Sequence, residues 1–347
     1  MNEPSIRVRN LTKSFGGRRV VDGLSFDVEK GQVFALLGHN GAGKSTTIDL
    51  ILGLKAPEIG TAKILGMDAA RNRKQVFERV GVQLQHTQYQ SAITVEEACI
   101  EYASLYAAPA DFRQLLESFG LNELRKSFVS KLSGGERQKL SVVLALIGKP
   151  EIVLLDEPFS ALDSYLRDRL LTEVKDLLGG LKQEMMLVTH SRDEAYTMCG
   201  KLLVMDHGKI CDQGNTKEVF ADPHSIPAAV LTGCKNIYAA RAAGETAVEI
   251  TDLGVIMETG RPVRQDLCAI GIRAHYFNPK AKTNLFPVML TEEVESPFEW
   301  TLKFRYLNQK EGTPDVWWRV TKDKKLQSFP QELGIAPANL LLLYPYE

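Results

Sequence analysis

The sequence has no long hydrophobic run, and its first residues lack the apolar pattern expected of a secretory leader. Hydrophobic residues fill 44% of its 347 positions. Even so, no stretch approaches the roughly 18 consecutive apolar residues that a membrane-spanning helix needs. The N-terminal residues include Glu3, Arg7 and Arg9 where a secretory signal would place an apolar core. We therefore expect a chain that stays in the cytoplasm.

Cysteine is scarce and neither charge dominates. The five cysteines are scattered, odd in number and without Cys-x-x-Cys spacing, which argues against both a disulfide framework and a zinc site. A formal net charge of -1, with basic residues spread along the chain, gives no electrostatic reason to expect a nucleic-acid partner. The composition is that of an ordinary globular protein, and its length suggests two domains.

Hydrophobic periodicity divides the chain into an N-terminal domain (1–230) and a C-terminal domain (231–347). In the first, short apolar runs alternate with helical periods, which predicts an α/β domain with a largely parallel sheet and a helical subdomain at about 86–150. Buried strands are expected at 33–37, 152–155 and 185–188, and helices near Gly43, Val95, Asp111, Gly134, Ser164 and Arg192, with Asp163 as an N-cap. In the second, runs at 247–250, 254–257, 269–272, 300–304 and 316–320 predict a small β-rich domain.

A glycine-rich motif follows the first buried strand. It reads Gly38, His39, Asn40, Gly41, Ala42, Gly43, Lys44, Ser45 and Thr46, which matches the P-loop pattern between a strand and a helix. In such a loop backbone N–H groups and a helix N-terminus surround phosphates, the lysine reaches the β- and γ-phosphates, and the serine ligates Mg²⁺. A glycine-rich turn that binds nothing is the alternative, and the strand and helix on either side argue against it.

Two carboxylates end the strand predicted at 152–155. Asp156 would hold Mg²⁺ and Glu157 would act as general base toward the attacking water, because adjacent strand residues point in opposite directions. On its own, an Asp-Glu pair after a strand is more often a solvated strand end. The P-loop upstream favours the catalytic interpretation.

Together these motifs resemble the ATP-binding cassette (ABC) ATPases. The similarity covers residues 1 to about 225 and adds a glutamine loop ending at Gln85, the signature Leu-Ser-Gly-Gly-Glu at 132–136, a D-loop at 160–163 and a switch histidine at His190. The resemblance implies a P-loop NTPase cassette that binds ATP and Mg²⁺. It also gives a reason for the two adjacent glycines of the signature at a helix start, although each lowers helix stability by about 1 kcal/mol relative to alanine.

The resemblance further implies a role for each motif. Two cassettes would pack head to tail, so that Ser133, Gly134 and Gly135 of one copy cover the γ-phosphate held by Lys44 of the other. Gln85 would link Mg²⁺ and the water to a membrane partner and His190 would contact the γ-phosphate. Asp163 would cross the dimer interface, and Phe15 would stack on adenine. The alternatives are a packing role for Phe15 and an ordinary surface or core position for His190.

The two parts of the chain resemble different ABC classes. Residues 1–155 are similar to cassettes of multidrug and polymer exporters, whereas residues 156–347 are similar to ATPase subunits of molybdate and other oxoanion importers. Two explanations fit a change close to Asp156: a chimera made by recombination or fusion, or one continuous but unusual lineage.

The resemblance implies an ATPase subunit at the cytoplasmic face of the cell membrane, where it would power transport with integral membrane subunits. The importer-like part indicates molybdate or related oxoanion import. Its C-terminal domain resembles small barrel-like regulatory domains, with an oxoanion as a ligand or, as the alternative, with a dimer-stabilising role and no ligand. An ATPase subunit of a multidrug or polymer exporter is one alternative. A non-transport soluble ABC ATPase is another.

Overall fold

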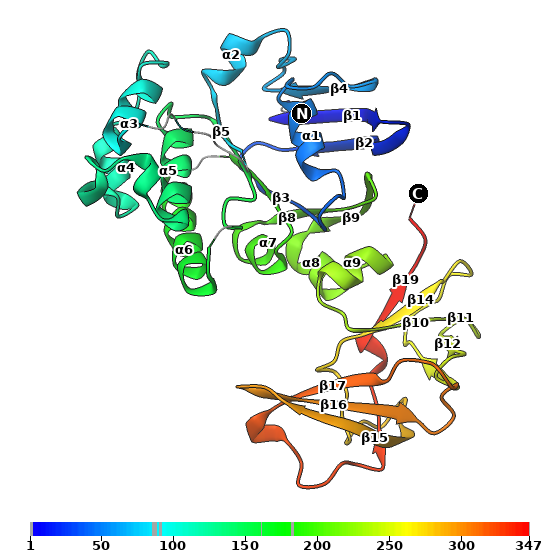
Figure 1. Ribbon diagram of the computed structural model, residues 1–347. Helices are drawn as coiled ribbons and strands as arrows, with labels where there is room; N and C mark the ends of the chain where they lie inside the picture. The colour runs from blue at the N-terminus through cyan, green and yellow to red at the C-terminus, as the bar shows by residue number, and fades with distance from the viewer. Residues whose placement is uncertain (1–2, 85–88, 90–91, 161, 182–183, 347) are drawn as a thin grey trace. The chain divides into compact units, whose positions relative to one another are not determined.

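The computed structural model describes residues 3–84, 89, 92–160, 162–181 and 184–346. The chain forms two compact units, Met1–Thr216 and Lys217–Glu347. Many elements of both units are labelled in Figure 1, in which residues of uncertain placement are grey. No helix in the described ranges is both long and apolar enough to span a membrane.

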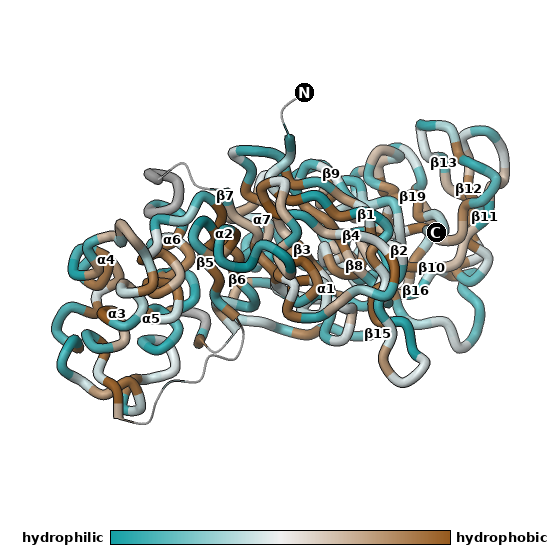
Figure 2. Tube along the Cα trace, turned by 90° about the horizontal axis from the view of Figure 1, so that it is seen from above, coloured by the Kyte–Doolittle hydropathy of each residue, from teal (hydrophilic) through white to brown (hydrophobic). Residues whose placement is uncertain are grey.

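A six-stranded sheet forms the centre of the first unit. Its order is β5-β6-β7-β3-β8-β9, parallel except for the last pair. The strands are β3 (Val33–Gly38), β5 (Val80–Gln83), β6 (Ile152–Asp156), β7 (Glu184–Thr189), β8 (Lys201–Asp206) and β9 (Lys209–Asn215). Strands β3 and β6 are nearly continuous hydrophobic runs, brown in Figure 2, because strands of a covered parallel sheet are buried on both faces.

A separate antiparallel sheet lies beside α1. It has the order β2-β1-β4 and consists of β1 (Ile6–Phe15), β2 (Arg18–Val28) and β4 (Ile59–Ile64). Helix α1 contacts β2 and β4 of this sheet as well as β3 of the central sheet. Buried residues from β1, β2, β3, β6 and α1 share one hydrophobic core. The antiparallel sheet adds to the largely parallel one that the sequence predicts.

The α-helices described in the first unit begin close to the predicted positions, except the short helix at 73–77, which the sequence does not predict. They are α1 (Lys44–Ile51), α2 (Arg73–Phe77), α3 (Val95–Ala103), α4 (Phe112–Ser118), α5 (Gly134–Leu146), α6 (Ser164–Leu181) and α7 (Arg192–Met198). Asp163 Oδ1 accepts a hydrogen bond from the Leu166 backbone N–H at 3.0 Å, which confirms the predicted N-cap of α6. Helices α3, α4 and α5 fall between β5 and β6, in the region expected to be helical.

The second unit is β-rich, as predicted. Its sheets are β10-β14-β19, β11-β12-β13 and β17-β16-β15-β18, and most of their buried residues belong to one core. The elements are α8 (Thr216–Ala221), α9 (Ile226–Leu231), β10 (Asn236–Ala239), β11 (Arg241–Ala242), β12 (Ala247–Ile250), β13 (Val255–Glu258), β14 (Ala269–Ile272), β15 (Phe286–Glu295), β16 (Glu299–Tyr306), β17 (Val316–Thr321), β18 (Glu332–Leu333) and β19 (Leu340–Leu343).

The two compact units meet at residue 216, whereas the change in sequence texture indicates a boundary at 230. The difference has a packing cause, since α9 lies against β14 and β19 of the second unit. Its buried residue Ala229 belongs to a small cluster with Cys234 and Leu341. The segment before residue 230 therefore contributes apolar contacts to the β-rich unit.

Candidate functional site

Steric crowding requires glycine at two positions of the loop between β3 and α1. Gly43 caps α1 with φ 102°, and a Cβ there would lie 2.3 Å from the Val20 carbonyl oxygen. A Cβ on Gly38 would lie 2.7 Å from the Met205 carbonyl oxygen. Both distances are shorter than any real contact, so the loop can follow this path only without side chains at these positions.

Lys44 is buried at the start of α1 and is held by three oxygen atoms. Its Nζ donates to the carbonyl oxygens of Gly38 at 2.8 Å and His39 at 3.2 Å, and lies 3.3 Å from Glu157 Oε1. The Lys44 side chain is only 5% exposed. A buried ammonium needs such compensation, and the arrangement fixes a positive charge at the mouth of the loop.

Glu157 lies between a lysine and a histidine. Its Oε1 faces Lys44, and its Oε2 accepts a short hydrogen bond from Nδ1 of His190. The residue has φ 51°, a left-handed conformation that costs a non-glycine residue about 1–2 kcal/mol. Backbone strain of this kind concentrates at functional sites. The structure thus brings together Lys44, Glu157 and His190, which the sequence places far apart.

Asp156 is a buried carboxylate with a perturbed pKa. Burial raises the pKa of Asp156 to about 6, and a hydrogen bond from Ser45 opposes the rise. Its Oδ1 has no hydrogen-bond partner among the described residues. A buried oxygen without a partner beside a hydroxyl suits a hard cation such as Mg²⁺, so both predicted ligands in the described ranges fit that ion.

A cavity of about 270 Å³ opens at this loop. It is lined by Val20, Asn40, Gly41, Gly43, Lys44, Ser45, Thr46 and Glu157. The sequence pattern predicts all of these except Val20, which reaches the loop from β2. His39, also a predicted site residue, turns its ring toward Asp206 instead, with Nε2 2.6 Å from Oδ1.

One further polar residue near Asp156 escaped the sequence patterns. Gln83, at the end of β5, is 2% exposed, and its Nε2 donates to the carbonyl oxygens of Leu84 at 2.8 Å and Asp156 at 3.4 Å. Its Oε1 has no partner in the described part of the chain. The motif comparison selects Gln85, which lies outside the described residues, and nothing in the sequence distinguishes Gln83 from an ordinary strand residue.

Comparison with known proteins places this chain in a family. A family model described as "ABC transporter" matches residues 21–160. The putrescine transport ATP-binding protein PotG of Escherichia coli (strain K12) is 33% identical over 240 residues, which cover 68% of this chain and 63% of PotG. The Nod factor export ATP-binding protein I of Ralstonia nicotianae is 36% identical over 221 residues, 62% of this chain and 68% of that protein. The chain belongs to the ABC transporter ATP-binding family.

A solved structure of this family supports the fold. The structure titled "Structure of ATP binding subunit of ABC transporter" matches with a TM-score of 0.56 and 27% identity, covering 62% of this chain and 91% of that one. The family assignment confirms the predicted P-loop cassette of the ABC class. Because the chain spans only 63% of PotG, the properties of that whole protein do not transfer directly.

The ABC signature opens α5 with a capping box. Ser133 Oγ accepts from the Glu136 backbone N–H at 3.3 Å, and the Glu136 carboxylate accepts from the Ser133 backbone N–H at 2.8 Å. A Cβ on Gly135 would lie 2.9 Å from Cδ2 of Leu162, so an intramolecular neighbour also favours glycine there. Contacts of Ser133, Gly134, Gly135 and Asp163 with a second copy stay predictions.

Phe15 is exposed at the end of β1. Its side chain is 43% exposed, and the amines of Lys13 and Lys55 lie 5.6 Å and 5.3 Å from the ring centroid. An exposed aromatic ring flanked by cations can stack on a base whose phosphates need positive charge nearby. Its role with adenine stays a prediction.

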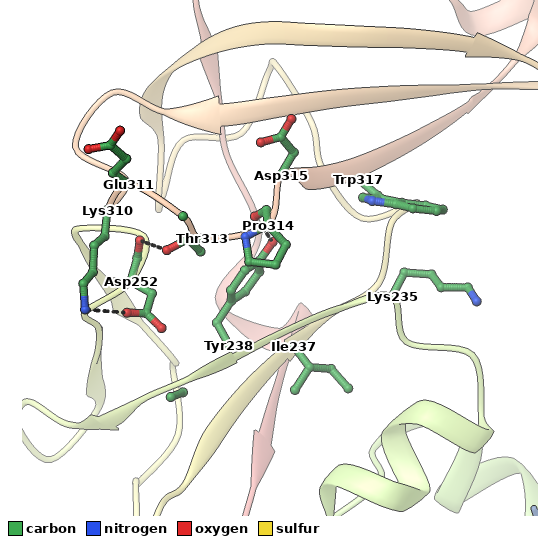
Figure 3. A pocket seen from close by; sticks show the side chains of 12 residues that line it. Lys235, Ile237, Tyr238, Asp252, Lys310, Glu311, Thr313, Pro314, Asp315 and Trp317 are labelled. Carbon is green, nitrogen blue, oxygen red and sulfur yellow. Dashed lines mark hydrogen bonds and ion pairs between the residues drawn. The ribbon is translucent and has the colours of Figure 1, made fainter.

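Two cavities lined by described residues of the second unit differ in charge. The larger, about 580 Å³, contains two lysines and three carboxylates: Lys235, Lys310, Asp252, Glu311 and Asp315. Figure 3 shows Lys310 paired with Asp252, and their amine and carboxylate lie 3.8 Å apart. The smaller, about 420 Å³, includes four basic side chains and no carboxylate among its described lining residues: His275, Lys280, Arg319 and Lys324.

Proposed function

We propose that this chain is the ATP-hydrolysing subunit of a transporter, and that it works as a dimer beneath integral membrane subunits. The observation that carries the proposal is the cluster of the buried Lys44 and Glu157 with His190 at the mouth of the P-loop. A lysine that only stabilised the fold would not need a strained glutamate and a half-exposed histidine beside it. The cluster places a phosphate-binding cation next to a base.

Each residue has a chemical role in this proposal. Lys44 exchanges the Glu157 carboxylate for the β- and γ-phosphates when ATP enters. Glu157, once released, accepts a proton from the attacking water, and His190 orients the carboxylate through its Nδ1 hydrogen bond. Asp156 and Ser45 would hold Mg²⁺, which neutralises charge on the phosphates.

The dimer follows from the position of the signature. Ser133, Gly134 and Gly135 start α5, so their N–H groups form a positive helix end that suits the γ-phosphate held by another copy. ATP between the two copies would hold them together, and hydrolysis would release them. We place the dimer at the cytoplasmic face of the membrane, bound to the membrane subunits it drives.

Nucleotide binding by a Lys44→Ala variant tests the proposal. Titration of the full chain with ATP and Mg²⁺ should show at least tenfold weaker binding for Lys44→Ala, because phosphates lose their buried cation. Lys63→Ala, which removes an exposed lysine of β4, is the matched control and should bind as the unmodified chain does. Equal affinity in all three proteins would refute the P-loop assignment.

For the transported substrate we propose the oxoanion class, molybdate or a relative of it, moving inward. The smaller cavity, which Lys280, Arg319 and Lys324 line, supports this choice better than the larger one, since a dianion favours positive charge and no carboxylate is among its described lining residues. Arg319 adds a specific feature: it pairs with Glu299 at 3.1 Å through Nη1, while its buried Nε has no partner among the described residues. That N–H is an available donor.

Calorimetric titration of the full chain with molybdate, tungstate, sulfate and phosphate tests the substrate class. Lys280→Gln should weaken binding of the preferred anion severalfold, whereas Lys235→Gln, in the mixed-charge cavity, should not. An absence of binding by the folded chain would remove the oxoanion proposal and leave the ATPase proposal intact. Export then becomes the better hypothesis, because residues 1–155 resemble exporter cassettes and one relative is named for Nod factor export.

A further inference from the structure

Three potential metal ligands gather beside the P-loop, outside the nucleotide cavity lining. His39 belongs to the loop after β3, while Asp206 ends β8 and His207 begins the turn between β8 and β9. One ligand atom from each of the three lies within 4.8 Å of the others. The two rings are in edge contact, with centroids 5.6 Å apart, and both histidines are exposed to solvent.

Hydrogen bonding at His39 determines which ring nitrogen carries the hydrogen. Nδ1 lies 2.7 Å from the Asn40 carbonyl oxygen, which can only accept, so Nδ1 carries a hydrogen. A neutral ring then has its lone pair on Nε2, only 2.6 Å from Asp206 Oδ1. Two lone pairs at that distance require a cation between them, either a proton or a metal ion.

We propose that His39, Asp206 and His207 form a binding site for a divalent transition-metal ion such as Zn²⁺, Co²⁺ or Ni²⁺. A metal bound at roughly 2.0–2.2 Å to each ligand of a tetrahedral site separates the ligand atoms by about 3.3–3.6 Å. The distances from Asp206 Oδ1 to the Nε2 atoms of His39 and His207, 2.6 Å and 3.9 Å, bracket this separation. Small side-chain movements suffice.

The chemistry of the donors selects the metal class. Two imidazoles and one carboxylate suit Zn²⁺, Co²⁺ and Ni²⁺, whereas Mg²⁺ prefers an all-oxygen set. The Asn40 carbonyl that accepts from His39 Nδ1 is the outer partner that metal-binding histidines commonly have. This site is therefore distinct in chemistry from the pair Asp156 and Ser45.

A bound ion would connect two segments that already touch. The Gly208 backbone N–H donates to the Ala42 carbonyl oxygen at 3.0 Å, which joins the β8–β9 turn to the P-loop. Coordination by His39 on one side and by Asp206 and His207 on the other would add a second connection and restrain the loop. Transition metals would thereby regulate the movement that nucleotide binding requires.

Titration of the nucleotide-free, chelator-treated full chain with Co²⁺ tests the site. We expect saturable binding of one Co²⁺ ion. The visible absorption of a tetrahedral site with nitrogen and oxygen ligands measures this binding, and Zn²⁺ should displace the Co²⁺. His207→Gln and His39→Gln should each lower the Co²⁺ affinity at least tenfold. His275→Gln, an exposed histidine in the other unit, is the matched control and should leave the affinity unchanged.

Two results would overturn the proposal. One is that the unmodified chain binds no Co²⁺, which means that no such site exists, or that it and His207→Gln bind Co²⁺ with equal affinity, which means that the ion binds elsewhere. The other is an intense near-ultraviolet thiolate band, which assigns the ion to a cysteine. Because His207 is 70% exposed, its glutamine variant should fold, and an unchanged melting temperature verifies this.

Discussion

At the scale of single residues, Asp156 is the group whose titration has the clearest consequence. Burial raises its pKa from an ordinary 3.8 to about 6, so folding holds a proton that the unfolded chain releases between these values. Stability contributed by this group is full below pH 4, declines as pH rises to about 6, and stays low above that. At pH 7 the ionised carboxylate therefore destabilises the nucleotide-free chain.

An Asp156→Asn variant should consequently be more stable than the unmodified chain at pH 7. The expected gain is at most about 3 kcal/mol, the equivalent of two pKa units. Urea unfolding of both proteins without nucleotide or Mg²⁺, at several pH values from 4 to 8, measures it. The gain should shrink toward zero near pH 4; a gain independent of pH would show that charge burial is not its cause.

Residue patterns predict a site when its members share one loop or one strand end. The P-loop residues and the pair Asp156 and Glu157 are predictable from the sequence because each group lies in one short segment. Contacts made through space were not: the His39 to Asp206 interaction spans 167 positions, and Gln83 meets Asp156 across 73. No local residue spacing encodes contacts between segments so far apart in the sequence. The order of strands in the sheet must be known before these contacts can be predicted.

At the scale of helices, two capping boxes of the same type allow an effect on stability to be told apart from an effect on activity. Thr94 caps α3 and Ser133 caps α5, each with a glutamate three residues later. Replacing either cap with alanine should lower the free energy of unfolding by about 1 kcal/mol, because one N-terminal N–H loses its partner. Chemical denaturation of Thr94→Ala and Ser133→Ala measures both.

ATPase assays on the same two variants complete the comparison. Ser133 is also a predicted phosphate contact of the second copy, so Ser133→Ala should reduce turnover severalfold, while Thr94→Ala should not. Equal turnover in the two variants would assign Ser133 a capping role alone. Equal loss in both would mean that the loss follows from reduced stability.

Strands were predictable where burial dominates their composition. β3, β6 and β7 are apolar runs and were located within about a residue of their observed ends, as were β12 and β14. β15 (Phe286–Glu295) was not singled out, since its second half is acidic and exposed and gains its strand conformation from pairing with β16. Tertiary pairing overrides a weak local preference there.

At the scale of the whole molecule, the sequence divides at a different position from the packing. Residues before 230 look like a continuation of the α/β unit, yet α9 packs on β14 and β19. The change of family resemblance at Asp156 has no counterpart in the fold, because β6 pairs with β5 and β7 along its length. Helix docking and strand pairing depend on distant segments that local composition does not reveal.

Dimer formation is the property in which the whole molecule takes part, and Glu157→Gln should reveal it. The substitution removes the proposed base and should lower turnover at least about 100-fold, the usual contribution of such a group. It also removes the carboxylate that competes with phosphates for Lys44, 3.3 Å away, so ATP should bind at least as well. Slow hydrolysis with intact binding should therefore accumulate an ATP-bound dimer.

Light scattering after size exclusion measures this directly. Glu157→Gln with ATP and Mg²⁺ should elute as a dimer and without nucleotide as a monomer, while the unmodified chain should dimerise only transiently. The double variant Lys44→Ala, Glu157→Gln should stay monomeric in both conditions, because it lacks the cation that holds the phosphates. A monomeric Glu157→Gln protein with demonstrated ATP binding would contradict the head-to-tail arrangement. Gly135 would then have only the intramolecular explanation that Leu162 supplies.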